Sequence, residues 1–262
     1  MNRIDERFAK VKADGRKALI TFLTVGDPNL EVSEKAIYTM QEEGVDLIEL
    51  GVPFSDPAAD GPVIQRADER ALAQGVDIFK VFELVRKIRN NVEVPMVFLL
   101  YYNVMVQYGI EKFFKCCQET GVDGLIIPDL PYEESDEIKE YTEKYGVYQI
   151  SLVSPTSKDR IKNIAKDAKG FLYCISSLGV TGEKSSFVTN FDEFVGTIKK
   201  YTDVPACVGF GVSNGKQVKE LTKYFDGAIV GSAIVKSIAT GESVEERINN
   251  LREKIKDLKS GL

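Results

Sequence analysis

The sequence predicts an α/β protein, a single (β/α)8 TIM barrel with an extra N-terminal helix. Short apolar runs alternate with longer amphipathic stretches along the whole chain, which is the pattern of repeated β-α units. The length of 262 residues suits one barrel better than two ordinary domains of about 150 residues each. No G-x-G-x-x-G motif opens the first β-α turn, which disfavours a doubly wound open sheet, the alternative architecture.

Eight apolar runs are predicted to be strands, because strands covered on both faces are nearly continuous in Val, Ile, Leu and Phe. They span residues 18–25, 46–50, 96–100, 124–128, 148–153, 171–175, 206–210 and 227–231. Apolar side chains at helical spacing predict the helices between them. These are residues 31–43, 78–90, 111–120, 133–145, 158–168, 191–201, 214–224 and 244–258, with the extra helix at 4–12.

Glycines mark where helices are expected to end. Gly44, Gly121 and Gly146 each follow a helical pattern, and Gly is favoured just past a helix C-terminus. The phrase Gly-Val-Asp occurs at 44–46 and again at 121–123, a weak repeat of one β-α unit. The chain contains no linker-like or low-complexity stretch, so residues 1–262 are expected to form one domain.

Composition excludes several classes of function. With 34 Lys and Arg against 40 Asp and Glu, the net charge is −6, and without a basic cluster we expect no nucleic-acid partner. No apolar run approaches the ~18 residues of a membrane span, and the charged N-terminus carries no secretion signal, so a cytoplasmic location is expected. The four cysteines form no C-x-x-C pair and are expected to be reduced, buried thiols. The chain has no His, which leaves proton chemistry to carboxylate, Tyr, Lys or Cys and excludes His-ligated metals.

Glu49 is the first candidate for such chemistry. It lies in an apolar strand near its C-terminal end, where barrels carry their active sites. Its neighbours Ile48 and Leu50 would face outwards, so Glu49 should point into the barrel, where burial would raise its pKa. The alternative is a structural Glu paired with Lys, Arg or backbone donors.

Asp56 and Asp60 follow in a loop rich in Pro and Gly. Both could act in the site, but both could also serve as turn formers. In the second interpretation Asp60 caps a helix that has Pro62 near its start.

Two further segments predict a phosphate site and a lid. Gly-rich ends follow the last two strands, at 209–213 and 231–234, where barrels often bind phosphate through backbone N–H groups. Ser232 would add a hydroxyl donor there. The small, polar loop 176–186 suits a mobile lid with hinges at Gly179 and Gly182, or else a plain surface loop.

The stretch from Glu49 to Gln65 closely resembles the signature of the tryptophan synthase alpha chain family. The segments 179–182, 209–213 and 231–235 resemble it as well, and the similarity covers nearly the whole chain. The resemblance implies retro-aldol cleavage of indole-3-glycerol phosphate to indole and glyceraldehyde 3-phosphate, in tryptophan biosynthesis. It implies that Glu49 is the acid–base catalyst and Asp60 the second carboxylate, with no cofactor or metal in this chain.

The resemblance also assigns binding and interface residues. Phe22, Leu99 and Ile126 would line the indole slot, with Tyr173 beside Glu49. Thr181 would contact Asp60 when the lid closes. Pro128 stands where some members have Ala, which would change the shape of the indole slot. Ser177 stands where some members have Arg, which would change the contacts of the lid. The remaining matches are Gly182, Phe210, Gly211, Gly231 and Ser232 at the phosphate, and Pro53, Asp56, Tyr101 and Asn103 at the partner interface.

The implied partner is the tryptophan synthase beta chain, which carries pyridoxal phosphate, in an allosteric α2β2 heterotetramer. Two other functions remain open at this point. Another phosphate-binding barrel enzyme, such as phosphoribosylanthranilate isomerase or indoleglycerol-phosphate synthase, would share the phosphate site but lack the stretch at 53–57. A barrel that had lost catalysis and served as a subunit would not need both Glu49 and Asp60.

Overall fold

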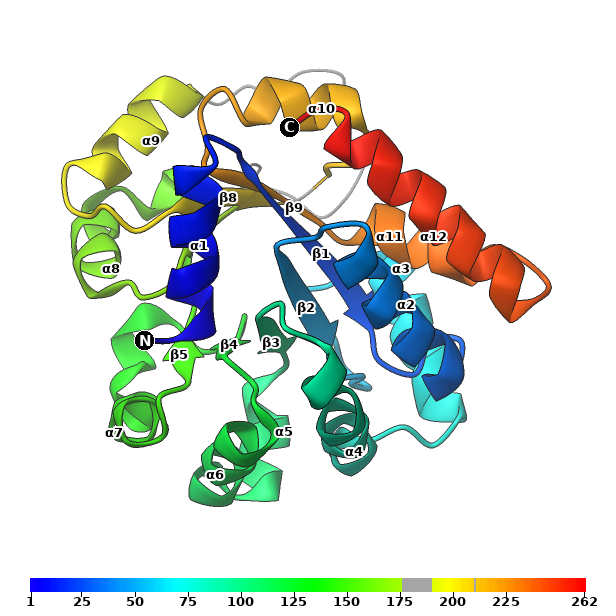
Figure 1. The fold of residues 1–262 in the computed structure, drawn as a ribbon. Helices are drawn as coiled ribbons and strands as arrows, with labels where there is room; N and C mark the ends of the chain where they lie inside the picture. The colour runs from blue at the N-terminus through cyan, green and yellow to red at the C-terminus, as the bar shows by residue number, and fades with distance from the viewer. Residues whose placement is uncertain (176–189, 210) are drawn as a thin grey trace.

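The computed structural model describes residues 1–175, 190–209 and 211–262 (Figure 1). Within this part of the chain, parallel strands form one sheet in the order β5-β4-β3-β2-β1-β9-β8-β7-β6. The strands are β1 (Ala18–Thr24), β2 (Leu47–Gly51), β3 (Met96–Leu99), β4 (Gly124–Ile126), β5 (Tyr148–Gln149), β6 (Ser151–Val153), β7 (Leu172–Ile175), β8 (Ala206–Gly209) and β9 (Gly227–Val230).

The two end strands of this sheet come from one continuous segment. The run 148–153, predicted as a single strand, is divided at Ile150 into β5, which pairs with β4, and β6, which pairs with β7. Ile150 is buried in the barrel interior. The two halves therefore bring the ends of the sheet together, and the predicted barrel is confirmed.

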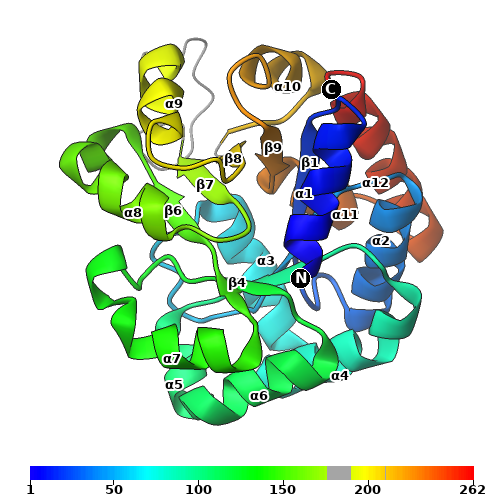
Figure 2. The same cartoon turned by 60° about the vertical axis from the view of Figure 1, so that its left-hand side comes forward.

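Helices surround the strands (Figure 2). The predicted helices are present with small shifts at their ends. Helices also lie at 102–108 and 232–239, where none was predicted, and at 62–73, where one was expected only if Asp60 acted as a helix cap. Gly44, Gly121 and Gly146 have φ between 69° and 79°, as expected at helix C-termini. The α-helices are α1 (Arg3–Ala13), α2 (Leu30–Glu42), α3 (Pro62–Ala73), α4 (Ile78–Ile88), α5 (Tyr102–Tyr108), α6 (Ile110–Thr120), α7 (Asp136–Tyr145), α8 (Ile161–Asp167), α9 (Phe191–Lys199), α10 (Gly215–Leu221), α11 (Ser232–Ala239) and α12 (Val244–Lys259), and the 3-10 helices are η1 (Arg89–Asn91), η2 (Tyr132–Glu134) and η3 (Pro155–Arg160).

The hydrophobic core has two main layers. One layer fills the space between the outer face of the sheet and the helices, and it includes Ile48 and Leu50. The other fills the barrel interior, where Ile20, Leu47 and Ile126 meet. Alternate residues of each strand thus face different layers, as the period of two requires.

Helix α1 closes the N-terminal end of the barrel. Its buried residues Ile4, Phe8 and Val11 belong to the interior cluster, and the Phe8 ring lies 5.7 Å from that of Phe171. Figures 1 and 2 both show α1 lying across this end of the strands. The extra helix predicted at 4–12 is therefore part of the core, and it leaves the C-terminal end of the strands for the site.

Three aspartates bind the backbone at the starts of strands. The side chain of Asp46 accepts the Leu19 N–H at 3.0 Å, and that of Asp123 accepts the Met96 N–H at 2.9 Å. Asp226 accepts the Ala206 N–H at 3.0 Å in the same manner. The repeated Gly-Val-Asp phrase therefore has a structural role, which is to fix neighbouring strands in register.

Candidate active site

Glu49 lies on the inner face of β2, near the C-terminal end of the strand. Leu47, two residues earlier, belongs to the barrel interior, whereas Ile48 and Leu50 belong to the outer layer. In the sheet register Glu49 stands between Phe22 of β1 and Val97 of β3. The inward direction predicted from strand alternation is confirmed.

The surroundings of Glu49 favour its protonated form. The residue is 1% exposed, and its Oε1 atom has no hydrogen-bond partner among the described residues. Burial raises the pKa of Glu49 to about 8. The carboxyl group is therefore neutral near pH 7 and able to donate a proton. The alternative was a structural Glu in an ion pair. Among the described residues, no Lys or Arg forms an ion pair with Glu49.

Asp60 lies in the loop between β2 and α3. The Tyr101 hydroxyl donates to its Oδ2 at 2.7 Å, and the same hydroxyl accepts the Ala59 N–H at 2.9 Å. Gln65 donates to the Asp60 carbonyl at 2.8 Å. Burial raises the pKa of Asp60, and the hydrogen bond from Tyr101 works in the opposite direction.

The helix-cap interpretation of Asp60 is wrong. Gly61 is the N-cap of α3, and it makes no side-chain cap bond; Pro62 occupies the first turn. The Asp60 side chain instead accepts a hydrogen bond from the Tyr101 hydroxyl. Asp60 thus binds the buried Tyr101 hydroxyl and not the N–H groups in the first turn of α3. Sequence spacing alone could not show this choice of partner.

Tyr173 lies close to both carboxylates. It belongs to the barrel-interior cluster on β7, and burial together with the charges of Glu49 and Asp60 raises its pKa well above the usual value. Its ring lies against Gly209 of β8, where a Cβ atom would come within 2.6 Å of the Tyr173 hydroxyl. Only glycine at 209 leaves room for this ring.

The predicted indole slot is an apolar surface above the barrel interior. Phe22 packs with Ile64 and Val235, and Leu99 lies against the same group. Ile126 belongs to the interior cluster and is the register partner of Leu99. In the sheet register, Phe22 stands beside Glu49, whereas Leu99 stands beside Gly51, two residues further along β2.

The predicted phosphate residues lie around the start of α11. Ser232 is the first residue of this helix, and Gly231 is its N-cap. The first N–H groups of a helix lack partners within the helix, and its N-terminus carries partial positive charge. Gly211, after β8, has φ of 83°, a conformation that favours glycine, and a Cβ atom there would meet nothing within 4 Å. Thr181, Gly182 and Phe210, with the hinge Gly179 and the departure Ser177, lie outside the described residues.

The predicted interface residues occupy the same end of the barrel but differ in exposure. Asp56 and Asn103 are exposed, whereas Pro53 is buried. Tyr101, assigned to the interface by resemblance, is 4% exposed, and its hydroxyl donates to Asp60. Tyr101 therefore contacts the candidate site, while its place at the interface stays a prediction.

Asp68 of α3 is a buried acid near Asp60 that sequence reasoning missed. It is 4% exposed, and Thr24 Oγ1 of β1 donates to its Oδ1 at 3.4 Å. Burial and the charge of Asp60 raise the pKa of Asp68 to about 8. The signal was available, because Asp68 falls on the buried face of α3 at helical spacing from Ile64 and Ala71.

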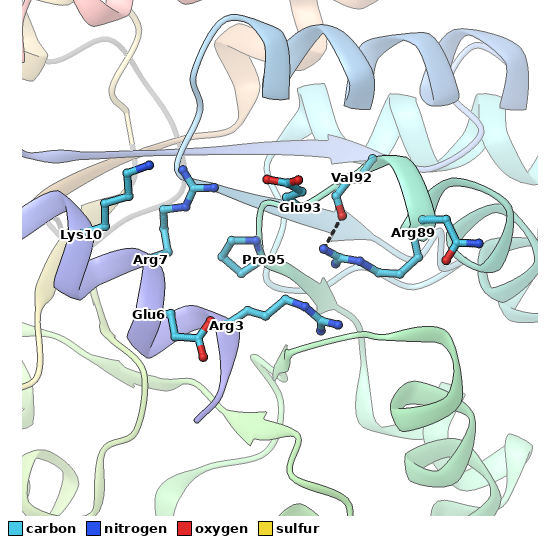
Figure 3. A pocket seen from close by; sticks show the side chains of 9 residues that line it. Arg3, Glu6, Arg7, Lys10, Arg89, Val92, Glu93 and Pro95 are labelled. Atoms are coloured by element: carbon cyan, nitrogen blue, oxygen red, sulfur yellow. Dashed lines mark hydrogen bonds between the residues drawn. The ribbon is translucent and has the colours of Figure 1, made fainter.

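Two cavities lie outside this group of residues. The cavity in Figure 3, about 470 Å³, is at the N-terminal end of the barrel between α1 and the segment before β3. The second, about 600 Å³, lies beside the loop after β2, and Phe54, Asp56 and Leu72 are among the residues that line it. Neither cavity is lined by Glu49 or Asp60.

Comparison with known proteins gives one consistent result. The family model described as tryptophan synthase alpha chain matches residues 8–262. The tryptophan synthase alpha chain of Thermoanaerobacter sp. (strain X514) is 48% identical over 262 residues, which is 100% of both chains. That of Methanocaldococcus jannaschii is 47% identical over 238 residues, 90% of this chain and 84% of the relative. A solved structure of Mycobacterium tuberculosis tryptophan synthase matches with a TM-score of 0.90 and 35% identity, covering 99% of this chain and 98% of that one.

Proposed function

The chain belongs to the tryptophan synthase alpha chain family, and we propose that Glu49 performs the proton transfers of the reaction that this family catalyses, while Asp60 stabilises the positive charge that develops on the indole ring. The protein is a lyase that cleaves indole-3-glycerol phosphate to indole and glyceraldehyde 3-phosphate. Membership of this family sets aside the alternative of another phosphate-binding barrel enzyme.

The chemistry needs an acid and a base at different atoms of the substrate. For the carbon–carbon bond to break, ring C3 must gain a proton so that the ring can accept the bonding electrons. The hydroxyl on the adjacent glycerol carbon loses its proton as the aldehyde forms. Positive charge develops at ring nitrogen N1 during this step, and a nearby carboxylate stabilises it.

The protonation state of Glu49 carries the proposal. With a pKa of about 8 and no hydrogen-bond partner for Oε1 among the described residues, Glu49 holds a proton that it can deliver to C3. The resulting carboxylate can then take the hydroxyl proton. The hydrogen bond from the Tyr101 hydroxyl favours the ionised form of Asp60. In this form Asp60 would accept a hydrogen bond from the N1–H group of the indole ring.

The apolar and phosphate ends of the substrate would lie on different strands. Phe22, Leu99 and Ile126 would contact the indole ring, with Tyr173 beside Glu49. Gly211, Gly231 and Ser232 would bind the phosphate, together with Phe210 and Gly182. Thr181 would close the site over Asp60. These roles rest on the positions of the described residues and on resemblance for the others.

The partner of the chain is the tryptophan synthase beta chain. We propose an allosteric α2β2 heterotetramer in which Pro53, Asp56 and Asn103 contact that partner, and pyridoxal phosphate resides on the beta chain, with no cofactor in this one. We also propose that residues 1–262 form one domain in the cytoplasm. No helix in the described part of the chain is both long and apolar enough to cross a membrane.

Substitution of the carboxylates tests these roles. We expect Glu49→Gln to lower kcat for glyceraldehyde 3-phosphate release about 10²- to 10⁴-fold, the usual effect of losing a general acid, with binding of the substrate retained. Asp60→Asn should also lower kcat. The measurement is product formation from indole-3-glycerol phosphate, with and without the beta chain.

Glu31→Gln is the matched control, since Glu31 is exposed on α2 and pairs only with Lys35 among the described residues. It should retain wild-type turnover. Near-full turnover in Glu49→Gln would contradict the assignment of Glu49. An inactive wild-type chain in the presence of its partner would instead support a non-catalytic subunit.

A further inference from the structure

Asp68 is a buried carboxyl group at the C-terminal end of the barrel that the proposed mechanism does not use. It lies on the face of α3 that covers the top of β1, with Ile64 and Ala67 beside it on Phe22. Its hydrogen bond comes from Thr24, two residues beyond Phe22 on the same strand. The carboxyl group therefore lies at the end of β1, close to the apolar group expected to hold the indole ring.

The position of Asp68 on α3 directs it towards Asp60. Side chains of a helix lean towards the helix N-terminus, and α3 begins at Pro62, just after Asp60. The negative charge of Asp60 raises the pKa of Asp68, and the charges of both acids raise the pKa of the Tyr101 hydroxyl. Thus Tyr101, Asp60 and Asp68 form one electrostatic group.

No cation balances Asp68 among the described residues. The nearby Arg70 is held by Asp27, to which it donates at 2.7 and 2.9 Å. Glu69, next along α3, is exposed and adds negative charge. Helix α11 also packs on α3, and its one titratable side chain, Lys236, is exposed. The described groups that interact with Asp68 are thus Thr24, Tyr101, Asp27, Asp60 and Glu69, and the last three are acids.

We propose that Asp68 is a positioning residue of the site, whose carboxyl group sets the negative potential at Asp60 and so supports the positive charge that develops on the indole ring. The proposal rests on the proposed role of Asp60. Asp68 acts through Asp60 and does not touch the reacting atoms. Its contribution is largest when it is ionised, because a charge stabilises an opposite charge more than a neutral acid does.

The pH dependence of a neutral replacement tests this role. The pKa of Asp68 is about 8, so the wild-type residue is neutral at pH 6.5 and ionised at pH 9, whereas Asp68→Asn is neutral at both. We expect the ratio of variant to wild-type kcat to fall at least threefold between pH 6.5 and pH 9, with KM changing less than twofold. Titration of Glu49 affects both proteins alike and cancels in this ratio. The assay is glyceraldehyde 3-phosphate formation by the chain with its beta chain.

Two further variants separate this role from a structural one. Thr24→Val removes the hydrogen bond that favours ionised Asp68, so the pH at which Asp68 contributes should move upwards. Glu69→Gln, which changes an exposed neighbour on the same helix, should keep its ratio to wild type constant across this range. If Asp68→Asn fails to fold, Thr24→Val carries the test.

A ratio for Asp68→Asn that is the same at every pH would overturn the proposal, since loss of packing does not depend on ionisation. So would a change confined to KM. In either case the roles of Glu49 and Asp60 would stand. Full turnover in Asp60→Asn would remove both the proposed role of Asp60 and the inference that rests on it.

Discussion

Individual residues of this site are controlled by burial more than by ion pairs. Glu49 and Asp68 both have a pKa of about 8 because each is withdrawn from water without a cation among the described residues. Asp46 and Asp123, at the opposite end of the barrel, are equally buried but bind arginines and backbone N–H groups. Buried acids at the closed end therefore stabilise the fold, whereas those at the open end keep perturbed pKa values, as is common in functional sites.

Ser232 gives a residue-scale test of the phosphate site. Ser232→Glu places a negative charge at the first residue of α11, so repulsion should weaken binding of glyceraldehyde 3-phosphate about tenfold or more. Ser237→Glu adds the same charge further along the same helix and should change affinity less than about twofold. Titration calorimetry measures both. Equal affinities for Ser232→Glu and wild type would place the phosphate elsewhere.

Single residues also show what a sequence can and cannot predict about a site. Glu49 was predictable, because a carboxylate in an apolar strand has few explanations. The Tyr101–Asp60 hydrogen bond was not, since the two residues are 41 positions apart and only the fold brings them together. Asp68 could have been found from its place on the buried face of α3, had that helix been recognised.

At the scale of elements, apolar periodicity predicted most strands and helices but missed α3, α5 and α11. Helix α5 spans only seven residues, too few to show a clear period, and α3 begins within a loop rich in Pro and Gly. The division of residues 148–153 into β5 and β6 was also invisible, because it depends on which neighbour each half pairs with.

Helix α1 provides the test at this scale. Phe8 is 6% exposed and packs on Phe171 in the barrel interior. We expect Phe8→Ala to lower the free energy of unfolding by about 3–5 kcal/mol, the usual cost of removing a buried phenyl group. Phe79, which is 52% exposed, is the matched control, and Phe79→Ala should cost far less. Denaturant titration gives both values, and a similar loss for the two variants would show that α1 does not contribute to the core.

At the scale of the whole molecule, buried acids make stability depend on pH. The pKa of Glu49 rises from 4.5 to about 8 on folding, so the folded chain binds more protons than the unfolded one between these values. The contribution of Glu49 is therefore least unfavourable below about pH 4.5, and it becomes more unfavourable as the pH rises towards 8. Asp68 acts in the same direction.

Glu49→Gln removes this cost and should raise the midpoint of thermal unfolding. We expect the increase over wild type to be larger at pH 8.5 than at pH 5, by about 3 °C or more. Glu31→Gln, at an exposed site, should show no such increase at the higher pH. An equal shift at both pH values for Glu49→Gln would mean that the acid is ionised throughout.

The closure of the barrel by α1 has a consequence for the path of molecules through the enzyme. With Ile4, Phe8 and Val11 filling the N-terminal end of the packed interior, the described residues leave the C-terminal end of the strands as the side from which ligands reach the site. Substrate must enter, and both products must leave, at this C-terminal end, which is formed by the loops after the strands. Any structure that covers this end, including a partner that contacts Asp56 and Asn103, therefore controls when substrate binds and where each product goes.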